Sequence, residues 1–110
     1  MASLASRTLR KLSREETFYF FTSIGNYTGE SAASLEEFVK KIEEFDTRSL
    51  EFHIYRGDFE EWVTKILGDE RLAEEIKTVR SLSLTGDALR RELYGVVSRR
   101  YEELKKGVQA

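Results

Sequence analysis

Helix-capping residues followed by apolar stripes are the feature that most constrains the fold of this chain. Glu37 follows Ser34 by three residues, the arrangement of a capping box, and Asp58, Asp69 and Thr85 begin similar segments. The apolar positions behind the four caps recur every three or four residues: Leu35, Phe38, Val39, Ile42 and Phe45; Phe59, Trp62, Val63, Ile66 and Leu67; Leu72, Ala73, Ile76 and Val79; Leu89, Leu93, Val96, Val97, Tyr101 and Leu104. This pattern predicts helices over about 35–45, 59–67 and 87–106, with another that starts at Asp69.

The front of the chain has a different pattern. The aromatic run from Phe18 to Thr22 predicts a strand, and residues 25–29, with two glycines, read as a loop after it. Residues 49–56 fit either a strand or a helix, and Gly57 at the end of a helical length favours a short helix. The predicted fold is therefore mainly α: a single compact domain of four to five helices with a short N-terminal strand or β-hairpin.

Composition narrows the class of protein further. The 110 residues are enough for one domain, and 35% of them are charged. The chain has no Cys and no Pro, one Met, one Asn and one Gln, which together with abundant Glu, Lys and Arg is typical of a heat-adapted source. Without Cys there is no disulfide or thiolate metal site, and no apolar run is long enough for a signal peptide or membrane span. We expect a cytoplasmic protein that does not enter the membrane.

Charge is distributed unevenly along the chain. Residues 1–14 carry a net charge of +4, residues 15–77 carry −9 and residues 78–110 carry +3. This division predicts a basic N-terminal helix or arm over 1–14 and a single helical domain over 15–110. The candidate contacts to RNA or to a partner protein are eight basic residues near the two ends: Arg7, Arg10, Lys11, Arg14, Arg90, Arg91, Arg99 and Arg100. The alternative is that the basic ends balance the acidic middle, within the monomer or across a dimer.

Catalytic motifs are not recognisable in this sequence. His53 is the only imidazole, and no Gly-x-Ser-x-Gly elbow or His-x-x-x-His pair accompanies it. Acidic pairs such as Asp58 with Glu61 fall at predicted helix starts, where carboxylates cap free N–H groups. We therefore predict no enzyme activity, no cofactor, no metal site and no small-molecule substrate; a small hydrolase or ligand-binding enzyme using His53 and Asp58 is an alternative.

Two segments carry a resemblance to a known family. The run FYFFTSIGNYTGESAASLEEF and the later run SLEFHIYRGDFEEWVTKILGDERLAEEI resemble an uncharacterised family of small, mostly archaeal domains over about residues 16–78. The matching positions are Ser34 to Glu37, His53, Asp58, Phe59, Trp62, Gly68, Asp69, Leu72 and Ala73. The resemblance implies a fold and no agreed activity. In general character the chain is also similar to archaeal ribosome-associated factors that dimerise or block the association of subunits.

These observations predict a non-enzymatic binding module that self-associates, as a homodimer. Its leading partner is a ribosomal subunit, contacted through protein and RNA by the basic ends, with a role in stress or translation regulation. A protein–protein adaptor without RNA contact is the alternative within the same class.

Overall fold

The structure, a computed structural model, describes residues 3–109, and it describes side chains from Ser3 to Gly107. The elements in chain order are α1 (Leu4–Leu9), β1 (Phe18–Ser23), β2 (Asn26–Ala32), α2 (Leu35–Glu44), α3 (Thr47–Arg56), α4 (Asp58–Trp62), the π-helix η1 (Val63–Leu67), α5 (Glu70–Ser81) and α6 (Gly86–Gln109). These residues form a single compact, mainly α domain, as the sequence predicts. The hairpin precedes α2 to α6, and α1 lies in the segment predicted as an N-terminal helix or arm.

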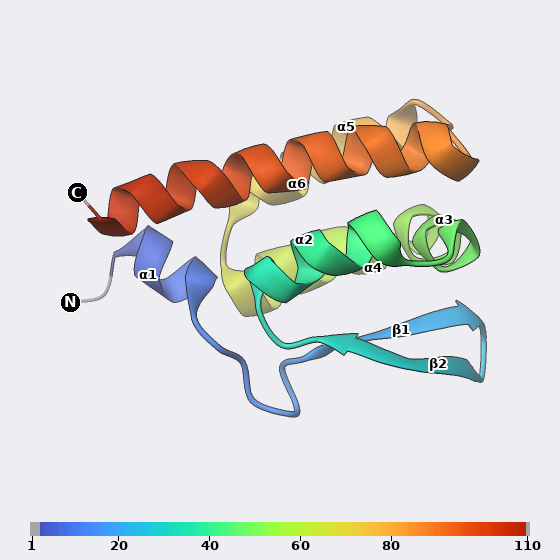
Figure 1. Cartoon of the computed structure of the whole chain (residues 1–110), viewed down its shortest axis with the longest axis horizontal. Helices are drawn as coiled ribbons and strands as arrows, with labels where there is room; N and C mark the ends of the chain where they lie inside the picture. Colours follow the sequence, from blue (N-terminus) through green and yellow to red (C-terminus); the bar gives the residue numbers. More distant parts are fainter. Residues whose placement is uncertain (1–2, 110) are drawn as a thin grey trace.

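Figure 1 shows how the elements are layered. The long helix α6 runs along the top of the view with α5 behind it, α2, α3 and α4 lie in the middle, and the hairpin lies at the bottom. Helix α1 packs beside the C-terminal end of α6, so the two chain ends lie at the same end of the molecule. Strand β1 pairs with β2 and contacts α3, while β2 contacts α2, so both strands pack against the middle helices.

Side-chain caps fix where α2, α3 and α5 begin. The Oγ of Ser34 accepts from the backbone N–H of Glu37 at 3.1 Å, which confirms the predicted cap of α2. The Oδ1 of Asp69 accepts from the N–H of Leu72 at 3.2 Å and caps α5 in the same way. Residues 49–56 lie within α3, which Asp46 caps through its bond from the Arg48 N–H at 2.9 Å. The favoured helix is therefore correct for this segment.

Gly57 joins α3 directly to α4. Its φ of 77° is left-handed, a conformation that costs a glycine little, and it both ends α3 and precedes the first residue of α4. The prediction that Asp58 caps the helix over 59–67 is wrong. Asp58 lies inside the first turn of α4, and its carboxylate is bonded to His53.

Two further local predictions differ from the structure. Residues 26–29, predicted as loop, belong to β2, because the chain turns within the two residues Ile24 and Gly25 and pairs again at once. The predicted helix over 59–67 changes from α to π at Val63, which adds a residue to the turn and delays its end to Gly68.

The core lies between the hairpin, the middle helices and α6. Its fully buried side chains include Phe20, Phe38, Phe59, Leu67 and Leu93, which come from five different elements. Within residues 3–109, no helix is both long enough and apolar enough to cross a bilayer.

Candidate functional site

A groove of about 540 Å³ lies between β1 and the segment that runs from α3 through α4 to η1. A volume in this range is typical of ligand and peptide sites. The lining residues central to its chemistry are Phe18, Tyr19 and Phe21 from β1, Ile24 from the turn, Phe52, His53 and Arg56 from α3, Asp58, Glu61 and Trp62 from α4, and Lys65 and Ile66 from η1.

His53 forms part of this groove and is held by both ring nitrogens. Its Nε2 accepts a hydrogen bond from the backbone N–H of Phe21 at 2.8 Å, and its Nδ1 lies 2.8 Å from Oδ2 of Asp58. Because Nε2 is an acceptor, the proton of the neutral ring is on Nδ1 and is donated to Asp58. Burial lowers the pKa of His53, and the neighbouring Asp58 carboxylate opposes that shift.

Ser49 completes the attachment of β1 to α3. It precedes His53 by one helical turn, and its hydroxyl donates to the carbonyl oxygen of Phe21 at 2.8 Å. Both main-chain polar groups of Phe21 are therefore bonded to side chains of one helix face. The spacing of Ser49 and His53 fixes the position of β1 relative to α3.

The charged residues of the groove form two internal pairs. Arg56 donates to Asp58 at 3.1 Å while its guanidinium lies 4.9 Å from the ring centre of Phe52. Lys65 donates to Glu61 at 2.8 Å, one helical turn away. With two cations and two anions paired in this way, the groove carries no net charge.

Aromatic rings form much of the remaining wall. The indole of Trp62 lies 5.4 Å from the ring of Phe18 and donates its Nε1–H to the Glu16 carbonyl oxygen at 2.8 Å. Phe21 and Tyr19 both lie against Tyr27 of the neighbouring strand, at ring distances of 5.4 and 5.9 Å. A neutral, aromatic groove favours an apolar side chain as its occupant.

This geometry bears on the predicted alternative in which His53 and Asp58 act in a reaction. The structure brings the two residues together, but both nitrogens of the ring are already engaged inside the protein. The ring could accept a proton from a substrate only after Nε2 had released the Phe21 N–H. Among residues 3–109 there is no cluster of three or more His, Cys, Asp or Glu side chains that could hold a metal ion.

The N-terminal arm supports the far end of the groove. Ile66 and Leu67 are the last two residues of η1, where carbonyl oxygens have no partner inside the helix, and the arm supplies a partner for each. Arg10 donates to Ile66 at 2.9 Å, and the buried Thr8 hydroxyl donates to Leu67 at 3.2 Å. The Arg7 guanidinium lies directly over Gly68. The segment that presents Lys65 and Ile66 to the groove is thus held by residues 7–10.

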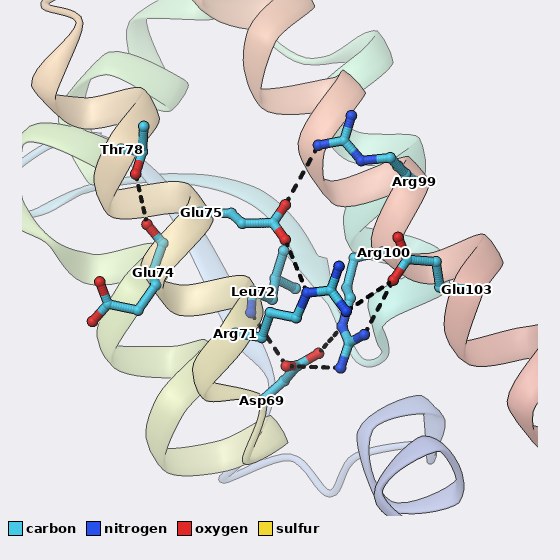
Figure 2. Close-up of polar contacts among 9 residues, drawn as sticks. All are labelled: Asp69, Arg71, Leu72, Glu74, Glu75, Thr78, Arg99, Arg100 and Glu103. Atoms are coloured by element: carbon cyan, nitrogen blue, oxygen red, sulfur yellow. Dashed lines mark hydrogen bonds and ion pairs between the residues drawn. The ribbon is translucent and has the colours of Figure 1, made fainter.

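The eight predicted contact residues occupy very different environments. Figure 2 shows Arg99 and Arg100 on α6, with Arg99 directed towards Glu75 of α5 and Arg100 towards Asp69, which immediately precedes α5. Arg100 is buried and grips the fully buried Asp69 with two bonds, of 2.7 and 3.2 Å, and Asp69 raises the pKa of its guanidinium. Arg99 is exposed and lies 3.5 Å from Glu75. Arg100 therefore has an internal role that differs from the predicted contact with RNA or a partner.

The other six lie nearer the surface. Arg90 is half-buried and donates to the Phe45 carbonyl oxygen, Arg10 also pairs with Glu16 at 3.1 Å, and Lys11 lies 3.6 Å from Glu37. The side chains of Arg7, Arg14 and Arg91 form no hydrogen bond or ion pair with another residue of the described part of the chain. The structure does not gather the eight residues into one site.

Sequence reasoning missed most of the groove. Ile24 carried a usable signal, because a β-branched apolar residue is unusual at the centre of a two-residue turn. Lys65 and Ile66 carried none, since the π-turn that orients them has no recognised sequence pattern. The sequence singles out Asp58 and His53. The bond between them depends on how α3 and α4 meet at Gly57, which the sequence does not show.

Comparison with known proteins gives a family but no activity. No significant match is found among curated proteins or among solved structures. The model of one family matches residues 15–110. That match covers nearly all of the chain beyond the arm, and the chain therefore belongs to the Family of unknown function (DUF5752).

Proposed function

We propose that this protein is a non-enzymatic binding module that receives an apolar side chain of another polypeptide in the groove beside β1. The observation that carries the proposal is the combination of aromatic walls with a rim whose charges are paired internally. A site of this kind gains affinity by removing apolar surface from water. We also propose that the protein is cytoplasmic.

Contact with a ribosomal subunit remains a prediction that rests on the sequence. The internal bonds of Arg100, Arg90 and Arg10 reduce the number of cations available for phosphate, so the groove is the better-supported contact surface. Exposed cations such as Arg14 and Arg91 remain for an additional RNA contact.

A peptide selection tests the groove directly. A displayed library of random peptides is selected against the wild-type chain and against two matched variants, Tyr19→Asp and Tyr55→Asp. Both tyrosines are exposed and both donate their hydroxyl to a backbone carbonyl, but only Tyr19 lines the groove. We expect selected peptides to share a large apolar residue and to bind the Tyr19→Asp variant about tenfold more weakly or worse, because a buried aromatic contact is lost.

The control variant Tyr55→Asp should bind the same peptides as the wild type does. Equal binding of the selected peptides by both variants, or selection of no peptide by the chain at a concentration where it is monomeric, would contradict the proposal. RNA binding that is lost on replacing Arg14 and Arg91 and unchanged in Tyr19→Asp would instead favour the ribonucleoprotein role.

A further inference from the structure

The hairpin next to the groove carries an unusual amount of exposed apolar surface. Ile24, at its tip, is 83% exposed, the largest value for any large apolar side chain among the described residues. Tyr19 and Tyr27 are exposed on the same hairpin and lie 5.9 Å apart, ring centre to ring centre. The hairpin therefore presents three large side chains with apolar surface that residues 3–107 leave at least partly exposed.

Ile24 is also fixed in position. It lies in a two-residue turn whose flanking residues, Ser23 and Asn26, pair directly, and the side chain of Asn26 donates to Thr22 beside it at 2.5 Å. A side chain on a short, bonded turn loses little freedom on binding. Ile24 is thus a protruding apolar side chain, a knob, on a backbone that is held in place before any partner binds.

The knob and the groove lie next to each other on one face, because Ile24 itself lines the mouth of the groove. Two identical surfaces can meet around a two-fold axis only if the complementary features are both present on the same face of one chain. Here a protruding apolar side chain and an apolar hollow satisfy that condition.

Electrostatics are compatible with a second copy as the occupant. Arg56 with Asp58 and Lys65 with Glu61 leave the rim neutral, so two copies of this face meet without net repulsion. The neutral rim offers no net charge to attract a strongly charged partner. The occupant that best fits both the shape and the charge is another molecule of the same chain.

We propose that the protein forms a two-fold dimer in which Ile24 of each copy enters the groove of the other. This inference rests on the proposed function, because it names the polypeptide that the groove receives. Each groove is completed by an isoleucine from the other chain, and formation of the dimer removes the hairpin apolar surface from water in both copies.

The test is the oligomeric state measured over a range of concentrations by analytical ultracentrifugation. We expect the wild type to convert from one to two chain masses as concentration rises. Ile24→Asp should weaken the dimer by about 100-fold or more, because a charge replaces the knob at both symmetric contacts. Leu82→Asp is the matched control: Leu82 is 51% exposed, lies outside the groove, and its replacement should leave the dimer unchanged.

A cross-linking experiment checks which residues meet. Since the chain has no Cys, a Ser23→Cys chain and a Lys65→Cys chain can be mixed and oxidised without interference. Both positions line the groove, so the two chains should form a mixed disulfide, whereas Leu82→Cys in place of Ser23→Cys should form none.

Two results would overturn the dimer. They are a wild type that stays monomeric at the highest soluble concentration, and an Ile24→Asp variant that is folded by circular dichroism and still dimerises. The peptide selection separates this failure from that of the proposed function. A monomer that selects apolar peptides overturns only the dimer, whereas a monomer that selects no peptide overturns the proposed function as well.

Discussion

His53, on which the alternative enzyme hypothesis depends, also holds elements of the fold together. Its ring connects three elements, since it lies on α3, accepts from β1 and donates to α4. An unpaired buried N–H costs about 1–3 kcal/mol, and loss of the ring also leaves a cavity. The cost of removing His53 is therefore expected to appear in stability.

Replacement of His53 by Ala should lower the free energy of unfolding by about 2–4 kcal/mol, measured by urea denaturation. Arg56→Ala removes only the exposed partner of Asp58 and should cost less than about 1 kcal/mol. A His53→Ala chain as stable as Arg56→Ala would show that the ring does not hold β1.

The lowered pKa of His53 also predicts a dependence of stability on pH. Below about 6.5, the ordinary pKa of the group, the unfolded chain takes up a proton that the folded chain resists. Folding stability is therefore complete above that pH and falls as the pH drops towards the lower folded-state pKa, by up to about 1.4 kcal/mol per unit.

Because this is the only His, His53→Gln should remove the pH dependence between about 7 and 5.5, as measured by thermal unfolding. The carboxylates that titrate with lowered pKa values, Glu16 and Asp46, contribute at more acidic pH. An unchanged slope in His53→Gln would assign the dependence to other groups.

At the scale of elements, α5 and α6 are joined by charges of two kinds. The Asp69–Arg100 pair is buried where α5 begins, while Arg71, Glu75 and Arg99 form exposed contacts farther along (Figure 2). Buried pairs leave a costly lone charge when one member is lost, whereas exposed pairs contribute little.

Substitutions of Arg100 and Arg99 distinguish the buried ion pair from the exposed one. Arg100→Ala should lower the free energy of unfolding by about 3–5 kcal/mol, because Asp69 is then buried without a partner. Arg99→Ala should lower it by less than about 1 kcal/mol. Denaturant titration of both variants measures the difference, and similar losses would contradict the assignment of Arg100 to the interior.

Most helices were predictable at this scale because their signals are local. The Ser34 cap and the stripe from Leu35 to Ile42 lie within one segment, so the position of α2 needed no tertiary information. The π-turn could not be predicted in the same way. The carbonyl oxygens of its last two residues are bonded to Thr8 and Arg10, which lie more than fifty residues away in sequence.

At the scale of the whole molecule, the arm is part of the same core as the helices that follow it. Ala5 and Leu12 belong to the single apolar cluster, and Leu12 donates its N–H to the carbonyl of Ala33 at 2.7 Å. The family match begins at residue 15, yet the residues before it complete the π-turn of this chain.

Removal of residues 1–11 should therefore lower the free energy of unfolding by about 3 kcal/mol or more, because two carbonyl oxygens lose their partners and apolar surface is exposed. Thermal unfolding of the full and shortened chains measures the loss. Thr8→Val removes one hydroxyl bond at nearly constant volume and should cost about 1–2 kcal/mol. An unchanged melting temperature in the shortened chain would mean that the arm is dispensable.

The groove was less predictable than the fold because it depends on how separate elements pack in the whole molecule. Its walls come from β1, the hairpin turn and three consecutive helical elements, and only the packing of α3 against β1 brings them together. Patterns within one segment identify which side chains are apolar. They do not show which of them face one another across a hollow.

The bonds from Ser49 and His53 to Phe21 have a consequence for growth of the sheet. A two-stranded sheet with both edges open can add strands on either side and extend without limit. Here helix side chains occupy the middle of the β1 edge, so only β2 can accept a further strand. Any strand pairing between copies then closes after two molecules, which protects a hairpin rich in aromatic residues from forming fibres.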